Sequence, residues 1–197
     1  MLESQVRSKV QPLFDKVGSF LIPYNITPNM ITLFAFVSGI ASGVMICFGK
    51  MIPALALLIL SGLLDILDGT VARLGKRSHA VGAYVDLISD RLVEAAVIFG
   101  FAVQYPQHSL SYLIFLIAVL MHFSTFVVAG TLFPNMGKKS MHYDASIVER
   151  AEAFFFFFFM MLFPEWIFGT LTLLNTLIIA AAMTRFVRVW NYAHNIS

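Results

Sequence analysis

Four aspartates stand at helical spacing in the middle of the chain. Asp65 and Asp68 lie three residues apart in one apolar stretch, and Asp86 and Asp90 lie four residues apart in the next. Residues three or four apart share one face of a helix, so each pair presents both carboxylates on the same face. A turn centred near Ser78 would pair the two stretches in antiparallel order. All four carboxylates are therefore predicted to converge in a small volume.

This acidic hairpin predicts a metal site. Ionised side chains at membrane depth are costly and usually functional. Like charges this close repel one another unless a cation neutralises them, and a cluster of oxygen ligands suits a hard divalent ion. We therefore expect the four aspartates to bind Mg²⁺ or, second, Mn²⁺. Pairing with Arg73 and Arg91 would explain one or two of these acids but not four on facing stripes. Glu94, one turn beyond Asp90, could join the site or support Arg91, and support is the favoured role.

Small residues accompany the acids on the same helix faces. Gly69 and Ala72 follow Asp68, and Gly82 precedes Asp86 by one turn. A face without large side chains lets a bulky ligand approach the backbone. The hairpin is therefore expected to hold a ligand as well as a metal.

The composition is that of a membrane protein. The chain has 197 residues, of which 59% are hydrophobic and 12% are charged, which excludes an ordinary soluble domain. No Asp, Glu, Lys or Arg occurs from Val17 to Gly49 or from Ala95 to Gly137, and each stretch can hold spans of about 20 residues. The net charge of +2 gives no indication of a nucleic-acid partner.

We predict an all-α integral membrane fold with six transmembrane helices in a single domain, residues 1–197. An amphipathic interfacial helix is expected over residues 1–22, broken near Pro12, and Thr27 and Pro28 are expected to cap and start the first span. The six-span catalytic bundle would cover residues 29–188. Its spans are predicted at 29–48, 52–74, 80–104, 110–132, 146–163 and 166–188.

Basic residues are concentrated at one set of loops and helix ends. Cytoplasmic loops of membrane proteins carry an excess of Lys and Arg, so this bias places both termini in the cytoplasm. The residues on this side are Lys76, Arg77, Lys138, Lys139, Arg185 and Arg188.

The pattern Asp65-x2-Asp68-Gly69-x2-Ala72-Arg73-x8-Gly82-x3-Asp86-x3-Asp90 resembles the signature of the CDP-alcohol phosphotransferases (CDP-alcohol phosphatidyltransferases) at every position. The segment Thr27-Pro28-Asn29-x2-Thr32 is similar to the one that helps hold the CDP group in this family. The resemblance implies a six-helix bundle, often a homodimer, with a polar cavity open to the cytoplasm.

The resemblance also implies roles for single residues. Asp65, Asp68 and Asp86 would hold the metal, with Asp90 close by as a further ligand and as the general base. The CDP contacts would be Pro28, Asn29, Thr32, Asp68, Gly69, Ala72, Arg73 and Gly82.

The expected reaction transfers a phosphatidyl group from CDP-diacylglycerol to the hydroxyl of a small alcohol and releases CMP. The short six-span chain resembles the microbial enzymes of this kind, which lie in the cytoplasmic membrane. Glycerol 3-phosphate, serine, inositol and inositol phosphate remain open as acceptors. The segment Phe126 to Phe133 lacks the arginines that inositol-phosphate-using relatives tend to have. A ring formed by Lys138, Lys139, Arg150 and Arg185 predicts a phosphorylated acceptor, with glycerol 3-phosphate ahead of inositol phosphate.

Three other functions fit part of the pattern. A water-soluble CDP-aminoalcohol could donate to diacylglycerol through the same hairpin. A cation transporter could use the acids, although transporters often carry repeats and broken helices, and neither is visible in this sequence. A catalytically dead relative acting as a scaffold is disfavoured by the intact set of acids. His79 and His142 are isolated, and no feature of the sequence marks either as a ligand.

Overall fold

The computed structural model describes residues 2–24, 26–75, 79–132 and 150–196. All regular secondary structure in these residues is helical, with no strand among them, as predicted. The residue contacts divide the chain into two compact units, Leu2–Gln107 and His108–Ser197.

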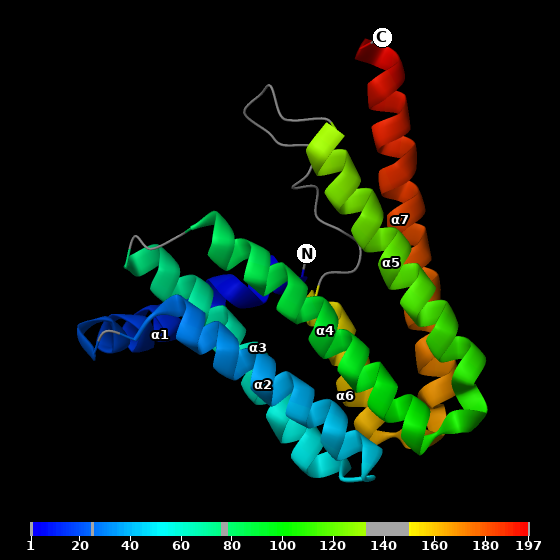
Figure 1. Ribbon diagram of the computed structural model, residues 1–197, viewed down its shortest axis with the longest axis horizontal. Coiled ribbons are helices and arrows are strands. Elements are labelled where there is room, and N and C mark those ends of the chain that lie inside the picture. Colours follow the sequence, from blue (N-terminus) through cyan, green and yellow to red (C-terminus); the bar gives the residue numbers. More distant parts are fainter. Residues whose placement is uncertain (1, 25, 76–78, 133–149, 197) are drawn as a thin grey trace. The chain divides into compact units, whose positions relative to one another are not determined.

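The first unit contains α1 (Leu2–Leu21), α2 (Pro28–Cys47), α3 (Met51–Leu74) and α4 (Ala80–Gln104), with a short 3-10 turn, η1 (Ile22–Tyr24), after α1. In Figure 1, α2 and α3 run side by side, and α2 packs against both α3 and α4. The predicted start of α2 is confirmed, because the Thr27 side chain accepts from the Met30 N–H at 3.4 Å and Pro28 occupies the first turn. This cap fixes where α2 begins, beside the acidic hairpin.

The contact between α2 and α4 depends on glycines. A Cβ atom added to Gly39 would lie 2.5 Å from a methyl group of Val93, and one added to Gly100 would lie 2.5 Å from the carbonyl oxygen of Gly43. Both distances are well below van der Waals contact, so the backbones approach more closely than any larger residue would allow. This packing fixes α4 against α2 and so positions the aspartates that α4 carries.

Helix α1 is continuous, which corrects the prediction of a break near Pro12. Pro12 lies inside the helix. A proline ring removes only one backbone donor, and contacts with α3 hold the rest of the helix in place. Gly18 lies against Thr70, Val71 and Leu74 of α3, whereas Leu13 and Phe20 are exposed on α1. The helix therefore joins the acidic helix on one face and presents apolar side chains on another.

The second unit contains α5 (Ser109–Leu132), α6 (Arg150–Leu162) and α7 (Ile167–Ile196). Two 3-10 turns precede α5 and α7, η2 (Pro106–His108) and η4 (Pro164–Trp166). Helices α5 and α7 pack together, and the side-chain amide of Asn175 donates to the backbone oxygen of Ser111 at 3.0 Å. A buried hydrogen bond of this kind, from a side-chain amide to the backbone, holds two apolar helices in register.

Within the described part of the chain, four helical segments are long and apolar enough to cross a membrane: Pro28–Cys47, Met51–Leu74, Pro106–Leu132 and Pro164–His194. The six α-helices described after α1 lie close to the six predicted ranges, but the count of six spans is not confirmed. Helix α4 carries four charged residues between Asp86 and Glu94, and α6 has only 13 residues. Helix α7 continues past the predicted end at residue 188 to Ile196, because no glycine or proline stops it.

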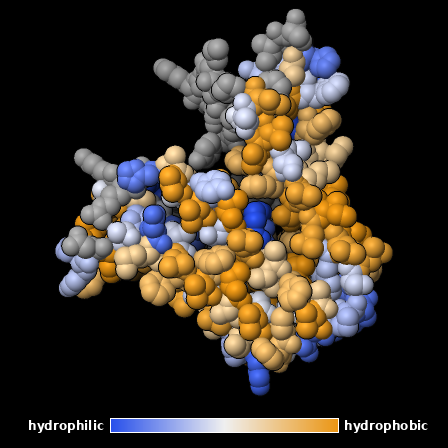
Figure 2. Space-filling model, in the orientation of Figure 1, coloured by the Kyte–Doolittle hydropathy of each residue, from blue (hydrophilic) through white to orange (hydrophobic). Residues whose placement is uncertain are grey.

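The surface agrees with membrane insertion. The face shown in Figure 2 is covered largely by apolar side chains. On α2 alone, Leu33, Phe34 and Val37 are each more than half exposed. Exposed apolar side chains over whole helices are typical of surfaces that face lipid.

The glycine contact gives a testable expectation. Gly100→Ala should lower the thermal stability of the purified protein, because the new methyl group overlaps the Gly43 carbonyl and overpacking costs about 1–3 kcal/mol. The matched control is Gly130→Ala, also in a helix, where an added Cβ meets nothing within 4 Å. Equal melting temperatures for both variants would contradict the proposed close packing.

Candidate metal and ligand site

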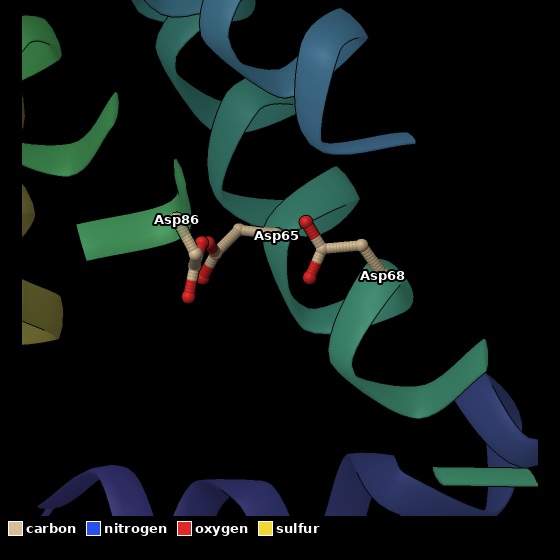
Figure 3. A group of neighbouring side chains, drawn as sticks. All are labelled: Asp65, Asp68 and Asp86. Carbon is tan, nitrogen blue, oxygen red and sulfur yellow. The ribbon is translucent and has the colours of Figure 1, made fainter. Parts of the chain in front are cut away.

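Three carboxylates converge between α3 and α4. Asp65 and Asp68 come from successive turns of α3, and Asp86 comes from α4. Each offers one carboxylate oxygen that lies within 4.8 Å of the other two. Figure 3 shows the carboxylates of Asp65 and Asp86 next to one another, with that of Asp68 pointing toward them. Asp90 follows one turn later on α4 and is not part of this group, so three of the four predicted ligands are brought together.

The donor set fits a hard divalent cation. All three groups are carboxylates, which are the ligands that Mg²⁺ and Mn²⁺ prefer. Magnesium–oxygen bonds of about 2.1 Å allow two ligand oxygens to be at most about 4.2 Å apart. Carboxylates separated by up to 4.8 Å therefore need only small rotations to bind one ion. Asp65, Asp68 and Asp86 are the residues that would hold it.

Asp68 is the most buried of the three, with 6% of its surface exposed. The hydroxyl of Thr32, on α2, donates to Asp68 Oδ2 at 2.5 Å. A buried carboxylate loses the hydration that stabilises its charge, so a hydrogen bond to the ionised group offsets part of that loss. Helix α2 thereby contributes to the acidic site, although the acids themselves come from α3 and α4.

A cavity of about 420 Å³ opens beside the acidic cluster. Seven of the eight predicted CDP contacts lie in its wall, contributed by the starts of α2 and α4 and the end of α3. Gly82 lies against Asn29, since a Cβ at Gly82 would be 3.6 Å from Asn29 Oδ1. The lining residues are Pro28, Asn29, Thr32, Asp68, Gly69, Ala72, His79, Val81, Gly82, Ala83 and Asp86.

Arg73, the eighth predicted contact, does not line this cavity. Its guanidinium donates to the Thr70 hydroxyl oxygen at 3.1 Å, and Gln11 of α1 donates to the same oxygen at 3.1 Å. Gln11 also donates to Asp15 at 2.7 Å. Arg73 remains beside the site, because a Cβ at Gly69 would lie 3.7 Å from Arg73 Nη1. Helix α1 is thus hydrogen-bonded to the residue that holds Arg73.

Sequence reasoning missed part of the wall. His79, Val81 and Ala83 line the cavity, and His79 stands at the position just before α4. The sequence did hold a signal for His79, because it precedes Gly82, a predicted contact, by three residues and so falls close to the same helix face. The roles of Gln11 and Thr70 had no signal, since their contact joins residues 59 positions apart.

Outside the cavity, Glu94 behaves as predicted. Its carboxylate lies 2.8 Å from a guanidinium nitrogen of Arg91, and Glu94 is buried. The prediction that Glu94 supports Arg91 is confirmed. This pair fixes two charges on the helix that carries Asp86 and Asp90.

Among the predicted acceptor residues, only Arg185 has a described side chain. Its guanidinium donates to the backbone oxygen of His122 at 3.1 Å and stands 5.4 Å from the centre of the Phe126 ring. These contacts hold it against α5 of the same unit. Arg150 begins α6, whereas Lys138 and Lys139 lie outside the described residues.

Comparison with known proteins agrees with the signature. The family model described as CDP-alcohol phosphatidyltransferase matches residues 25–189. The inner membrane protein YnjF of Escherichia coli is 31% identical over 199 residues, which cover 97% of this chain and 95% of that protein. An archaetidylinositol phosphate synthase of Pyrococcus horikoshii is 31% identical over 99 residues, about half of each chain (50% and 53%).

The fold resembles that of a solved enzyme. The phosphatidylinositol phosphate synthase of Mycobacterium tuberculosis, crystallised with CDP-DAG bound, superposes with a TM-score of 0.78 at 18% identity. The match covers 91% of this chain and 94% of that one. The same protein has been solved in complex with manganese and citrate, with a TM-score of 0.77 at 19% identity over 90% of this chain and 88% of that one. At this level of identity the likeness shows a shared fold.

The acidic cluster predicts metal binding that can be measured directly. Asp68→Asn should abolish or greatly weaken binding of Mn²⁺ to the purified protein, because an amide supplies neither the charge nor the same ligand strength. Electron paramagnetic resonance detects free Mn²⁺ and gives the affinity. The control is Glu165→Gln, an exposed acid in η4, which should bind like the unmodified protein. Unchanged Mn²⁺ affinity in Asp68→Asn would rule out this site.

Proposed function

The chain belongs to the CDP-alcohol phosphatidyltransferase family, and we infer from this that it transfers a phosphatidyl group from CDP-diacylglycerol to the hydroxyl of a small alcohol, releasing CMP. One observation carries the inference. Two members of the acidic cluster, Asp68 and Asp86, stand in the wall of a cavity that Pro28, Asn29, Gly69, Ala72 and Gly82 also line. The short side chains at three of these positions leave room for a nucleotide against the helix backbones.

The donor binds with its CDP group in the cavity and its acyl chains in the membrane. Asn29 offers an amide that can donate to and accept from the nucleotide, and Arg73 supplies a positive charge beside the diphosphate. A divalent ion held by Asp65, Asp68 and Asp86 would neutralise charge on that diphosphate, whether the ion is Mg²⁺ or Mn²⁺. The acids at these helix ends would therefore lie near the lipid headgroups.

The reaction needs a base at the acceptor hydroxyl. Asp90 lies one turn beyond Asp86 on the same face of α4, and we propose its carboxylate as this base. The acceptor oxygen attacks the phosphorus that bears the diacylglycerol and gives its proton to Asp90. The bond from that phosphorus to the bridging oxygen breaks, and CMP leaves with the electron pair. Atoms and charge then balance without any further reactant.

We propose that the six α-helices described after α1 form one catalytic bundle in a cytoplasmic membrane, with α1 at the interface and both termini in the cytoplasm. The bias of Lys and Arg toward one side supports this orientation. Labelling a cysteine introduced at His108, in a chain with Cys47→Ser, should succeed only from outside the cell. The protein is further proposed to act as a homodimer, which light scattering of the purified protein would detect as twice the chain mass.

The function is tested by release of CMP from CDP-diacylglycerol in the presence of Mg²⁺ and a panel of alcohols. Asp90→Asn should retain Mn²⁺ binding but lose at least about a hundredfold in kcat, since general base catalysis contributes roughly 10²–10⁴-fold. EDTA should stop the reaction, and added Mg²⁺ should restore it. Full activity in excess chelator would end the proposal. If CMP were released only when a CDP-aminoalcohol and diacylglycerol were supplied, the direction of transfer would be reversed.

The acceptor is proposed to be a phosphorylated alcohol, with glycerol 3-phosphate ahead of inositol phosphate. The support is a set of cations that are expected from the sequence to form a ring: Lys138, Lys139, Arg150 and Arg185. Contacts from arginine to phosphate are strong and directional. Among the relatives, the archaetidylinositol phosphate synthase keeps inositol phosphate within the panel.

Arg185→Ala should raise the KM for the phosphorylated acceptor by about tenfold or more, because a lost charged hydrogen bond costs roughly 1.5–3 kcal/mol. The KM for CDP-diacylglycerol should change much less. The contact of Arg185 with His122 and Phe126 also holds α7 against α5, so Arg185→Lys serves as a control that keeps the charge. Equal changes for both substrates, or transfer only to serine, would remove Arg185 from the acceptor site.

A further inference from the structure

Thr32 connects the first span to the acidic site. Its hydroxyl donates to Asp68 Oδ2 at 2.5 Å, and the backbone oxygen of Pro28 lies 3.1 Å from the same hydroxyl. A threonine hydroxyl has one proton to donate. An ionised carboxylate is the stronger acceptor, so the shorter bond to Asp68 takes that proton.

The surroundings make this bond persistent. Thr32 is 8% exposed and Asp68 is 6% exposed, so water has little access to compete for either group. The two residues come from different helices, α2 and α3, which pack against each other along their lengths. The bond therefore depends on the tertiary structure, and α2 is fixed at this end by the Thr27 cap.

The bond restricts the orientation of Asp68. The last torsion of an aspartate side chain is broad, so an unrestrained carboxylate can turn its plane freely. A donor fixed on a neighbouring helix holds one oxygen and thereby sets the plane of the other. Asp68, like Asp86, belongs to the acidic cluster and also lines the cavity. An error in its plane would displace a ligand shared by the metal and the nucleotide site.

We propose that Thr32 is a positioning residue for the metal site, which acts by orienting Asp68 and not by contact with the nucleotide. This inference rests on the proposed function, since it requires that the aspartates bind a divalent cation. It replaces the expectation from the sequence that Thr32 holds the CDP group. Phosphate oxygens need hydrogen-bond donors, and the one proton that Thr32 can donate is already given to Asp68.

The same pair of helices offers a control residue for a purely structural role of the Thr32 hydroxyl. Ser42 of α2 is fully buried and donates to the backbone oxygen of Ala54 on α3 at 2.8 Å. It joins the same two helices as Thr32 but ends on a neutral carbonyl away from the acids. Ser42→Ala therefore removes a buried interhelical hydroxyl without touching a metal ligand.

The experiment measures Mn²⁺ affinity by electron paramagnetic resonance on the full chain in nanodiscs, without nucleotide. Thr32→Val keeps the shape and removes the hydroxyl, and it should raise the Kd for Mn²⁺ roughly 10–100-fold, the usual loss when a group that orients a metal ligand is removed. Thr32→Ser keeps the hydroxyl and should stay close to the unmodified protein. Ser42→Ala should leave the Kd unchanged. The KM of Thr32→Val for CDP-diacylglycerol, measured at saturating Mn²⁺, separates loss of the metal from loss of a nucleotide contact.

Each alternative gives a different result. Wild-type Mn²⁺ affinity in Thr32→Val would overturn the inference, and so would an equal loss in Thr32→Ser or in Ser42→Ala. A raised donor KM at saturating Mn²⁺ with unchanged metal affinity would make Thr32 a nucleotide contact. If Thr32→Val does not fold, Thr32→Ala takes its place with the same expected loss. An unmodified protein that binds no Mn²⁺ would instead overturn the metal-dependent function, and this inference with it.

Discussion

The repulsion among Asp65, Asp68 and Asp86 is the constraint on which the rest of the site depends. Three carboxylates with oxygens within 4.8 Å of one another stand between apolar helices, where charge is poorly solvated. Such an arrangement is stable only if packing elsewhere holds the two helices together and if ligands compensate the charge. The capped start of α2, the hydrogen bond from Thr32 and the hydrogen-bonded residues Gln11 and Thr70 all lie around this cluster.

Helix α2 provides most of the packing that holds α3 and α4 together, although it carries none of the acids. Gly39 and Gly43 let α4 approach until the backbone of Gly100 meets that of Gly43. The opposite contact, with α3, includes the buried hydrogen bonds of Thr32 and Ser42. One helix therefore sets the distance between the two aspartate-bearing helices. A change in that distance would alter the geometry of the metal ligands before it altered their chemistry.

The sequence predicted this half of the molecule well, because its information is local. Helical spacing places Asp65 and Asp68 on one face, and the Thr27–Pro28 pair marks the start of a helix whatever lies around it. The partners of these residues are not local. The bond from Thr32 to Asp68 spans 36 positions, and that from Gln11 to Thr70 spans 59. No periodicity encodes such pairs, so nothing in the sequence indicated that Thr32 and α1 form hydrogen bonds with residues of α3. The predicted break at Pro12 was wrong for a related reason. A proline by itself indicates a helix break, but this local signal carries no information about the packing of α1 on α3.

If the aspartates bind a cation, as proposed, metal binding and folding would be coupled by the same charges. A cation that binds only the folded arrangement stabilises it by mass action, in proportion to how far its concentration exceeds the dissociation constant. The unfolded chain holds its aspartates far apart and gains little from the ion. The same repulsion that destabilises the hairpin without a cation would therefore favour the binding of a cation. Close glycine packing and the bond from Thr32 keep the carboxylates together without an ion, so a bound cation would spend less of its binding energy on ordering the site. A site assembled in advance by an uncharged helix can bind both the cation and the diphosphate that the cation neutralises.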